Sequence, residues 1–270
     1  MAFIRRYWHV LHPGTPFVDG WPLWAMAEHL EAVTFGEIQR LLINVPPGFM
    51  KSFMVDVFWP AWEWGPMNMP YLRYVAFAYS SHLTERDNLR FLNLLRSPEY
   101  QGDWGSGSAP PAKRGEPVRH EVVLEKRGET IVTNTKYGFK FASSVTGVGT
   151  GERGDRVILD DPHKVNEGEL PRTGTVEWFR SAMSNRLNDA KTSAIVIIMQ
   201  RWHEDDLSGW LLDMQEFGDK WEVLELPAIN VNGEPLWPEF YPLASLERIR
   251  ASSLPRDWSA LYQQRPAPEE

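Results

Sequence analysis

The sequence of 270 residues contains no cysteine, so it has neither a disulfide framework nor a thiolate metal site. Long hydrophobic runs are also missing. The longest apolar run near a predicted strand covers residues 194–199, far short of the roughly 20 residues that span a bilayer. No apolar stretch of signal-peptide length follows the N-terminus. We therefore expect no membrane partner and no membrane-spanning segment, and the cytoplasm is the simplest compartment.

Positively charged residues are fewer than acidic ones. Lysine and arginine number 28 against 36 acidic residues, which leaves a net charge of −8. The protein as a whole is therefore not an electrostatic surface for nucleic acid, and any contact with DNA must be local. The composition, 43% hydrophobic and 24% charged, excludes disorder, collagen and coiled coil for the whole chain.

Short apolar segments alternate with longer amphipathic ones, a pattern typical of strand, crossover helix and parallel strand. It predicts an α/β fold with a mainly parallel central sheet flanked by helices. Beyond residue 221 the elements become short and punctuated by proline. We expect a core at residues 1–220, a lid-like subdomain at 221–264 and the start of a linker at 265–270. The predicted strands are residues 40–45, 74–80, 156–160 and 193–199, with a hairpin of 121–125 and 130–133, and the predicted helices are 52–64, 82–96, 175–187, 246–250 and 257–264.

The most informative segment joins the first predicted strand to a helix at residues 46–52. Phosphate binding needs a tight loop with converging backbone N–H groups, a lysine, and a hydroxyl for Mg²⁺, and Lys51 and Ser52 fit these roles. The strict pattern of the phosphate loop fails, because Val45 and Met50 stand where it requires glycine. The alternative is an exposed Lys-Ser pair at a helix start.

The second segment is an apolar strand that ends in Asp160 and Asp161. In a Walker B strand the first acid holds Mg²⁺ and the second orients or deprotonates the attacking water. Pro162 follows, so a plain turn is the alternative. The presence of both segments in one chain favours the nucleotide site.

A third apolar strand runs into polar residues 200–206, where a sensor of the γ-phosphate belongs. His203, Glu204 and Asp206 are unlike a metal site, because residues so close at a helix start cannot all point one way. We expect Glu204 and Asp205 to cap the helix that follows.

A fourth segment, residues 147–156, is rich in glycine and presents Arg153 just before the Walker B strand. Such a loop suits an arginine finger. A second phosphate cradle is the competing interpretation, and the absence of a following Lys-Ser or Lys-Thr pair argues against it.

Along nearly its whole length the chain resembles the N-terminal ATPase domain of the large terminase subunit of tailed bacteriophages. The most specific match is the string Arg-Trp-His-Glu-Asp-Asp-Leu at residues 201–207. The other matching stretches are residues 42–47 before Lys51 and Ser52, then 78–80, 97–100, 157–162, 221–227, 236–238 and 262–266.

The resemblance implies a P-loop ATPase of the ASCE type that drives double-stranded DNA into a capsid in the cytoplasm of the infected host. Its partners would be the portal protein, the small terminase subunit and further copies in a ring, although the isolated chain could be a monomer. Lys51, Asp161 and Arg153 would be catalytic, with Arg153 reaching a neighbour's nucleotide. The residues in contact with ATP would be Pro46, Pro47, Gly48, Phe49, Met50, Lys51, Ser52, Trp21 and Gln200. The ligands of Mg²⁺ would be Ser52 and Asp160.

Two departures from the family pattern matter. Gly48 and Met50 stand where the family has arginine and then glycine, so the loop arginine is missing and a bulky side chain lies where backbone approaches phosphate. Such proteins also continue past the Gln-Gln-Arg-Pro signature into a nuclease. We therefore expect a motor domain separated from its nuclease, by truncation or by separate encoding.

Three other functions compete with the packaging motor. A helicase-like translocase is disfavoured because no second motor domain follows. A nuclease would need Asp160 and Asp161 to converge with Glu204 and Asp206 within the two-metal distance of about 4 Å. A catalytically weak assembly module is the third, made credible by Met50.

Overall fold

The computed structural model describes residues 1–110, 118–145, 147, 151–165 and 168–267. Its centre is an eight-stranded sheet with the strand order β3-β4-β5-β2-β6-β7-β1-β8. The pairings of β5 with β2, β2 with β6, β6 with β7, β7 with β1 and β1 with β8 are parallel, whereas β3 and β4 form an antiparallel hairpin at one edge. This confirms the mainly parallel sheet. The strands are β1 (Arg40–Asn44), β2 (Arg73–Ala78), β3 (Leu124–Arg127), β4 (Ile131–Asn134), β5 (Phe139–Ser144), β6 (Arg156–Asp160), β7 (Ala194–Met199) and β8 (Glu222–Glu225).

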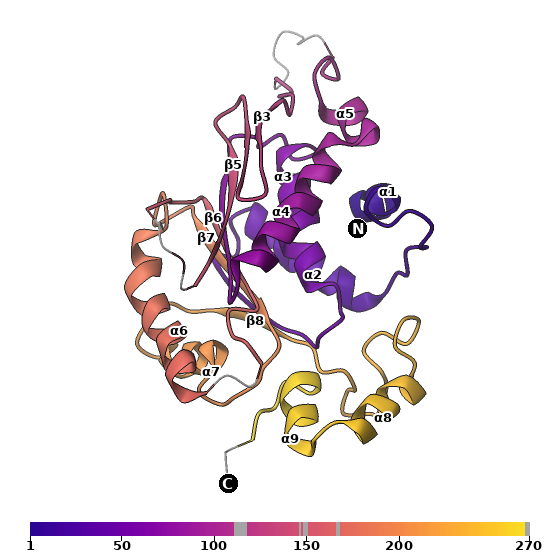
Figure 1. Ribbon diagram of the computed structural model, residues 1–270, viewed down its shortest axis with the longest axis vertical. Coiled ribbons are helices and arrows are strands. Elements are labelled where there is room, and N and C mark those ends of the chain that lie inside the picture. Colours follow the sequence, from indigo (N-terminus) through magenta and orange to yellow (C-terminus); the bar gives the residue numbers. More distant parts are fainter. Residues whose placement is uncertain (111–117, 146, 148–150, 166–167, 268–270) are drawn as a thin grey trace.

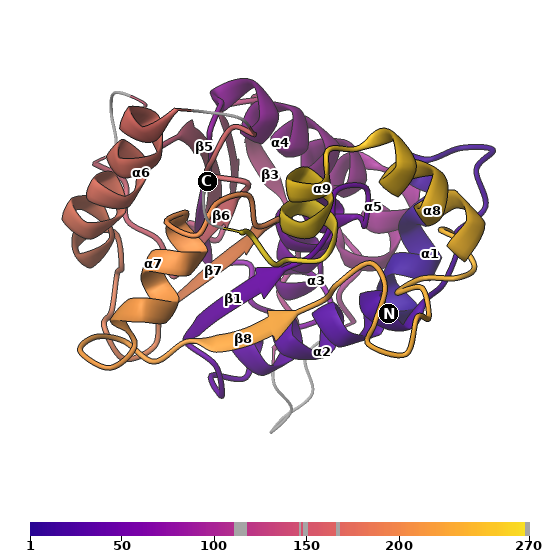
Figure 2. The same cartoon turned by 90° about the horizontal axis from the view of Figure 1, so that it is seen from below.

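Helices cover both faces of the sheet, and Figure 1 shows α1 to α5 on one side with α6 and α7 on the other. The first layer consists of α1 (Ala2–Leu11), α2 (Trp21–Thr34), the π-helix η1 (Phe53–Phe58), α3 (Trp59–Trp64), α4 (Ser81–Arg96) and α5 (Pro98–Trp104). The second consists of α6 (Glu169–Ala182), the 3₁₀ turn η2 (Met183–Asn185) and α7 (Leu207–Met214). The C-terminal part holds α8 (Leu243–Ser252), α9 (Pro255–Asp257) and the π-turn η3 (Trp258–Tyr262), and Figure 2 shows it beyond the ends of β1 and β8.

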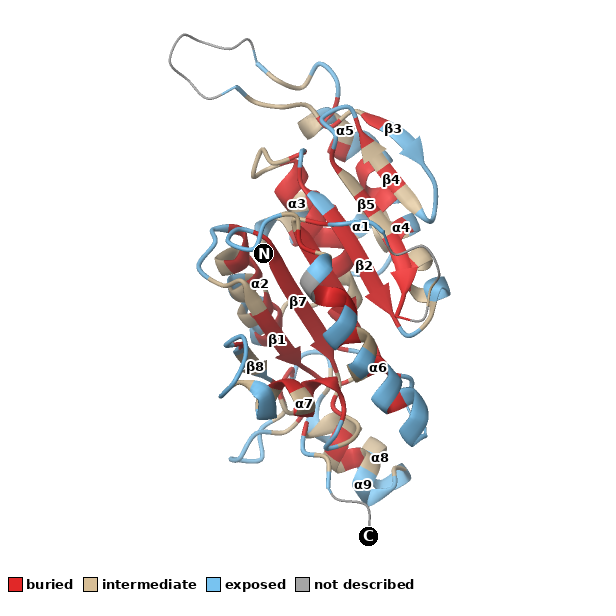
Figure 3. Ribbon diagram, turned by 90° about the vertical axis from the view of Figure 1, so that its left-hand side faces the viewer, coloured by how far each residue is buried: buried red, intermediate tan, exposed pale blue. Residues whose placement is uncertain are grey.

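The core has two apolar layers, one on each face of the sheet. Along β7, Val196 and Ile198 pack into the layer beneath α1 to α4, while Ile195 and Ile197 pack into the layer beneath α6 and α7. This alternation follows from the two-residue period of a strand. Because both faces are covered, the central strands are continuous apolar runs, and Figure 3 shows them buried along their length. No helix among the described residues has the length and apolar character needed to cross a membrane.

Several elements depart from the sequence-based expectations. The helix predicted at 175–187 begins six residues earlier, at Glu169, and ends at Ala182. Helices α1, α2 and α5 and strands β5 and β8 were not predicted. Strand β8 carries glutamate at both ends and pairs in parallel with β1. The structure therefore moves the boundary expected at residue 221, since the core sheet continues to Glu225.

The segment after residue 52 begins as a helix, as predicted, but with π-helical winding. The π-helix η1 passes into α3 at Trp59, so Pro60 lies in the first turn of α3, where its missing N–H is tolerated. A π-helix changes the angular position of each side chain relative to an α-helix. In this winding the Asp56 side chain is buried under the sheet.

Candidate functional site

The loop at residues 46–52 leaves the carboxyl end of β1 and turns directly into a helix. Two of its residues have left-handed backbone conformations, Gly48 with a φ of 84° and Met50 with a φ of 61°. Phe49 between them is buried and stacks on Tyr241 of the C-terminal part, with ring centroids 4.9 Å apart. Phe49 thus anchors the loop in the hydrophobic core, and its stacking on Tyr241 joins the loop to the C-terminal part.

Lys51 is buried and extends from this loop toward the ends of β6 and β7. Its ammonium group donates a hydrogen bond to Asp161, at 2.8 Å, and a second one to the Gln200 side chain. The backbone N–H of Gln200 also donates to Asp161, at 3.3 Å. The structure therefore brings together three residues that are 39 to 149 positions apart in the sequence.

The two acids at the end of β6 have different environments. Asp161 lies at the surface of the cavity, with a side chain 22% exposed, and has a left-handed φ of 46°. Such strain in a non-glycine residue is concentrated at functional sites. Asp160 is buried, and its Oδ1 atom has no hydrogen-bond partner among the described residues. Burial, followed by the charges of Asp161 and Asp56, raises the pKa of Asp160 well above its ordinary value.

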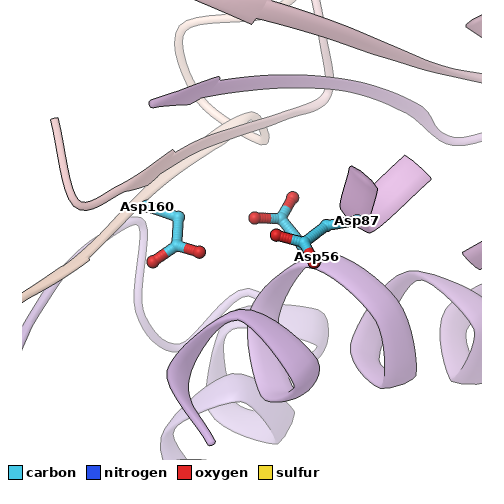
Figure 4. Close-up of side chains that lie close together, drawn as sticks. All are labelled: Asp56, Asp87 and Asp160. Atoms are coloured by element: carbon cyan, nitrogen blue, oxygen red, sulfur yellow. The ribbon is translucent and has the colours of Figure 1, made fainter. Parts of the chain in front are cut away.

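Two further buried acids face Asp160 from the helices, Asp56 of η1 and Asp87 of α4 (Figure 4). Oxygen atoms of the three carboxylates lie within 4.8 Å of one another. Asp56 is paired with the buried Lys140 of β5, at 3.2 Å. Burial raises the pKa of Asp56, and this effect is larger than the lowering by the charge of Lys140.

A cavity of about 670 Å³ opens at this edge of the sheet. Its polar end holds Lys51, Ser52, Asp161 and Gln200, of which the last three offer oxygen ligands that suit Mg²⁺. The buried Asp160 oxygen without a partner is an acceptor that a cation beside the cavity would satisfy. The remaining lining residues are Trp8, His12, Thr15, Pro16, Val18, Pro47, Gly48, Met50, Phe53, Arg86, Arg90, Trp237 and Phe240.

Trp21, which the family resemblance predicts to contact the base, lies outside this cavity. Trp21 is 54% exposed at the start of α2 and does not line the cavity. Trp237 takes the inner position, because its indole N–H donates to the carbonyl of Asp19 and its ring closes over Gly20. The aromatic wall of the cavity is formed by Trp8, Trp237 and Phe240 instead.

The polar segment after β7 is held by an internal ion pair. Buried Asp206 accepts two bonds from the Arg201 guanidinium and caps α7 by accepting from the Gly209 N–H. The expectation that Glu204 and Asp205 cap this helix is therefore wrong. Asp206 is neutralised by Arg201, and neither it nor Glu204 belongs to the acid cluster found among the described residues, which argues against a nuclease centre.

Arg153 is exposed and lies before the amino end of β6, whereas Asp160 ends that strand. At about 3.3 Å per residue the strand separates them by on the order of 15 Å, so Arg153 and the cavity lie at opposite ends of β6. Its Nε donates to the carbonyl of Asn185. Residues 148–150 of the glycine-rich loop lie outside the described residues. Arg156 and Arg201 are themselves buried and are paired with the buried acids Glu63 and Asp206, so neither reaches the surface as a finger would.

Sequence reasoning missed several residues of the site. Asp56, Asp87, Arg86 and Arg90 all come from the helices that follow β1 and β2, and Trp8 comes from the N-terminal helix. One signal was present. Asp56 is a lone acid in an otherwise apolar stretch, residues 53–59, which indicates a buried charge with a partner.

Three solved structures have a similar fold. The HK97 bacteriophage large terminase matches with a TM-score of 0.60 and 13% identity, over 97% of this chain and 53% of that one. A mutant of the large terminase ATPase domain of Thermus phage P74-26 matches with a TM-score of 0.55 and 13% identity, over 96% and 97%. The large terminase of a further, thermophilic bacteriophage matches with a TM-score of 0.52 and 6% identity, over 87% and 52%.

At these identities the similarity is one of fold, and it confirms at that level the resemblance seen in the sequence. The chain spans about half the length of the HK97 terminase and of the thermophilic-phage terminase, and nearly all of the P74-26 domain. No protein-family model and no curated protein sequence matches the chain.

Proposed function

We propose that the chain is the ATP-hydrolysing motor domain of a viral DNA-packaging terminase. The observation that carries the proposal is the position of Lys51, which reaches from the loop at residues 46–52 to Asp161 and Gln200 at the ends of two other strands. One strand, β7, lies between β1 and β6, which is the order expected of an ASCE-type P-loop ATPase. The fold shared with phage terminase structures supports the same function.

The chain's own groups fit the steps of phosphoryl transfer. Lys51 would exchange its contact with Asp161 for a phosphate oxygen of ATP, because both partners are anionic oxygens. Asp161, released from Lys51, would then orient the attacking water, and Gln200 would sense the terminal phosphate. Ser52 and Asp160 would hold Mg²⁺, which when bound neutralises charge on the phosphates.

The partners follow from the same proposal. Double-stranded DNA, the portal protein, the small terminase subunit and neighbouring copies in a ring would act on this domain. The C-terminal part would serve as a lid, since Tyr241 stacks on Phe49 of the loop and the side-chain oxygen of Gln264 accepts from the Arg201 N–H at 2.9 Å. A change in the loop is thereby transmitted to the C-terminal part.

ATP turnover by the purified chain tests this function. We expect Mg²⁺-dependent hydrolysis that falls by at least about 100-fold in Lys51→Ala, because the lysine stabilises developing charge in the transition state. Lys126→Ala, which removes an exposed lysine of β3, is the matched control and should keep native turnover. Equal turnover in the native and Lys51→Ala proteins would refute the phosphate-loop assignment. Nucleotide binding without any turnover would favour the assembly module.

A further inference from the structure

Helix α4 contributes two arginines to the cavity. Arg86 and Arg90 lie one turn apart on this helix and line the cavity with Lys51 and Asp161. Their side chains are 40% and 34% exposed, so both can be reached from the cavity. No arginine occurs within residues 46–52, so the loop itself offers a single cation to a triphosphate.

Both arginines are held by one buried acid. The Asp87 side chain is 2% exposed and accepts two bonds from Arg86, Nε at 3.2 Å and Nη2 at 2.8 Å. It also accepts from Nη1 of Arg90, at 2.7 Å. A guanidinium has five N–H donors, so three of those on Arg86 remain for another partner. A side-on pair of this kind fixes the plane of the guanidinium.

The two arginines serve different ends of the cavity. The Arg86 guanidinium is bound to Asp87, whose carboxylate lies within 4.8 Å of that of Asp160, so Arg86 lies near the polar end of the cavity. Arg90 lies 4.6 Å above the Phe53 ring. Arg90 thus lies beside the aromatic residues of the cavity.

Charge balance argues against a metal ion bound by Asp56 and Asp87, the two acids that the helices contribute to the cluster. Asp56 has Lys140 as its cation, Asp87 has Arg86 and Arg90, and Asp161 has Lys51. The two helix acids therefore have cations of their own, and Asp87 holds both arginines in place.

We propose that Arg86 contacts the terminal phosphate of the nucleotide in its own chain, with Asp87 as its positioning residue, and so takes the place of the missing loop arginine. The proposal rests on the proposed function and adds a contact in cis to the finger that Arg153 would supply in trans. At the polar end of the cavity the Arg86 guanidinium would contact an oxygen of the terminal phosphate, which ATP has and ADP lacks.

Binding of a slowly hydrolysed ATP analogue and of ADP, each measured by calorimetry with Mg²⁺, tests the contact. In Arg86→Ala the affinity for the ATP analogue should fall by about 10- to 100-fold, while that for ADP stays within about twofold, because one charged hydrogen-bonding group to the terminal phosphate is lost. Arg86→Lys should show a smaller loss, since it keeps the charge but not the fork. Arg96→Ala, on the exposed face of the same helix, should bind as the native chain does.

Equal losses for both nucleotides, or an unchanged preference for the ATP analogue in Arg86→Ala and Arg86→Lys, would overturn the proposal. If the native chain binds no nucleotide, the proposed function fails. If it binds and hydrolyses ATP and Arg86→Ala keeps the ATP preference, only the present inference fails.

Mixing variants separates a contact in cis from one in trans. Arg86→Ala mixed with Lys51→Ala should show no recovery of ATP turnover, because each protein is defective in its own site. Recovery in this mixture would show that Arg86 acts on a neighbour and would overturn the assignment in cis.

Discussion

Single residues of the loop explain how it departs from the family pattern. The backbone needs a left-handed conformation at two positions, and the sequence supplies glycine at Gly48 but methionine at Met50. A non-glycine residue in this region costs about 1–2 kcal/mol. An arginine in place of Gly48 would be strained in the same way. The backbone at position 48 therefore disfavours an arginine, whereas the backbone at position 50 would favour the glycine that the chain lacks.

Met50→Gly is predicted to tighten ATP binding several-fold. Glycine removes the strain and lets the loop amides close on phosphate. The free energy of unfolding should change by less than about 1 kcal/mol, because the relieved strain is offset by lost packing of the half-buried methionine and by the entropy of glycine. Calorimetric titration with ATP and urea unfolding measure the two effects.

Gly48→Ala provides the opposite case in the same loop. An alanine at position 48 would be strained at the φ of 84°, and its methyl group would lie 2.4 Å from Oη of Tyr241. We expect a loss of about 1–2 kcal/mol in the free energy of unfolding and weaker nucleotide binding. Tighter binding in Gly48→Ala, or weaker binding in Met50→Gly, would show that strain does not limit this loop.

At the scale of elements, one buried charge pair ties α3 to the sheet. Glu63 of α3 is fully buried and accepts from Arg156 of β6 at 3.0 Å and from the hydroxyl of Tyr74 of β2. Burial and the charge of Glu63 raise the pKa of Tyr74 well above its ordinary value, so the hydroxyl stays protonated and donates. The contact thereby joins α3, which continues directly from η1, to the central sheet.

Glu63→Gln is predicted to lower the free energy of unfolding by about 3 kcal/mol or more, because it leaves the Arg156 charge buried without a counter-ion. Urea unfolding followed by circular dichroism provides the measurement. Glu99→Gln, which removes an acid 44% exposed and 3.5 Å from His9, should change the free energy by less than about 0.5 kcal/mol. Similar values for the two variants would mean that the buried pair contributes no more than a surface one.

At the scale of the whole molecule, the position of Arg153 predicts dependence on assembly. It lies at the edge of the sheet opposite the cavity, where it would serve the site of another copy rather than its own. Arginine fingers are worth about 10³ to 10⁵ in rate, so the monomer should hydrolyse ATP slowly and turnover per chain should rise with protein concentration. Arg153→Ala should abolish that rise without changing nucleotide affinity.

A mixture of Arg153→Ala with Lys51→Ala should recover part of the activity, because one protein supplies an intact site and the other an intact finger. Steady-state ATPase assays over a range of mixing ratios measure the recovery. Turnover that is independent of concentration and survives Arg153→Ala would exclude the role in trans.

The sequence by itself determined the strands and the local chemistry at their ends. The apolar runs that became β1, β2, β6 and β7 are continuous because both faces of a parallel sheet are buried, and this composition is visible in one dimension. Asp160 and Asp161 could be singled out because polar residues at the end of such a run lie at the carboxyl edge of the sheet, and Lys51 because it belongs to the loop that leaves β1 at the same edge. These features depend only on neighbours along the chain.

Only the tertiary structure determined which distant residues lie next to Lys51, Asp160 and Asp161. Strand β8 joined the sheet through its backbone, which no side-chain pattern records, and Trp237 rather than Trp21 reached the cavity because Gly20 leaves room for its ring. Arg86 is in the cavity because helix packing and a buried partner, Asp87, fix its direction. A sequence shows which residues carry charge, but the energy of a buried charge is set by groups distant in the chain that pack around it.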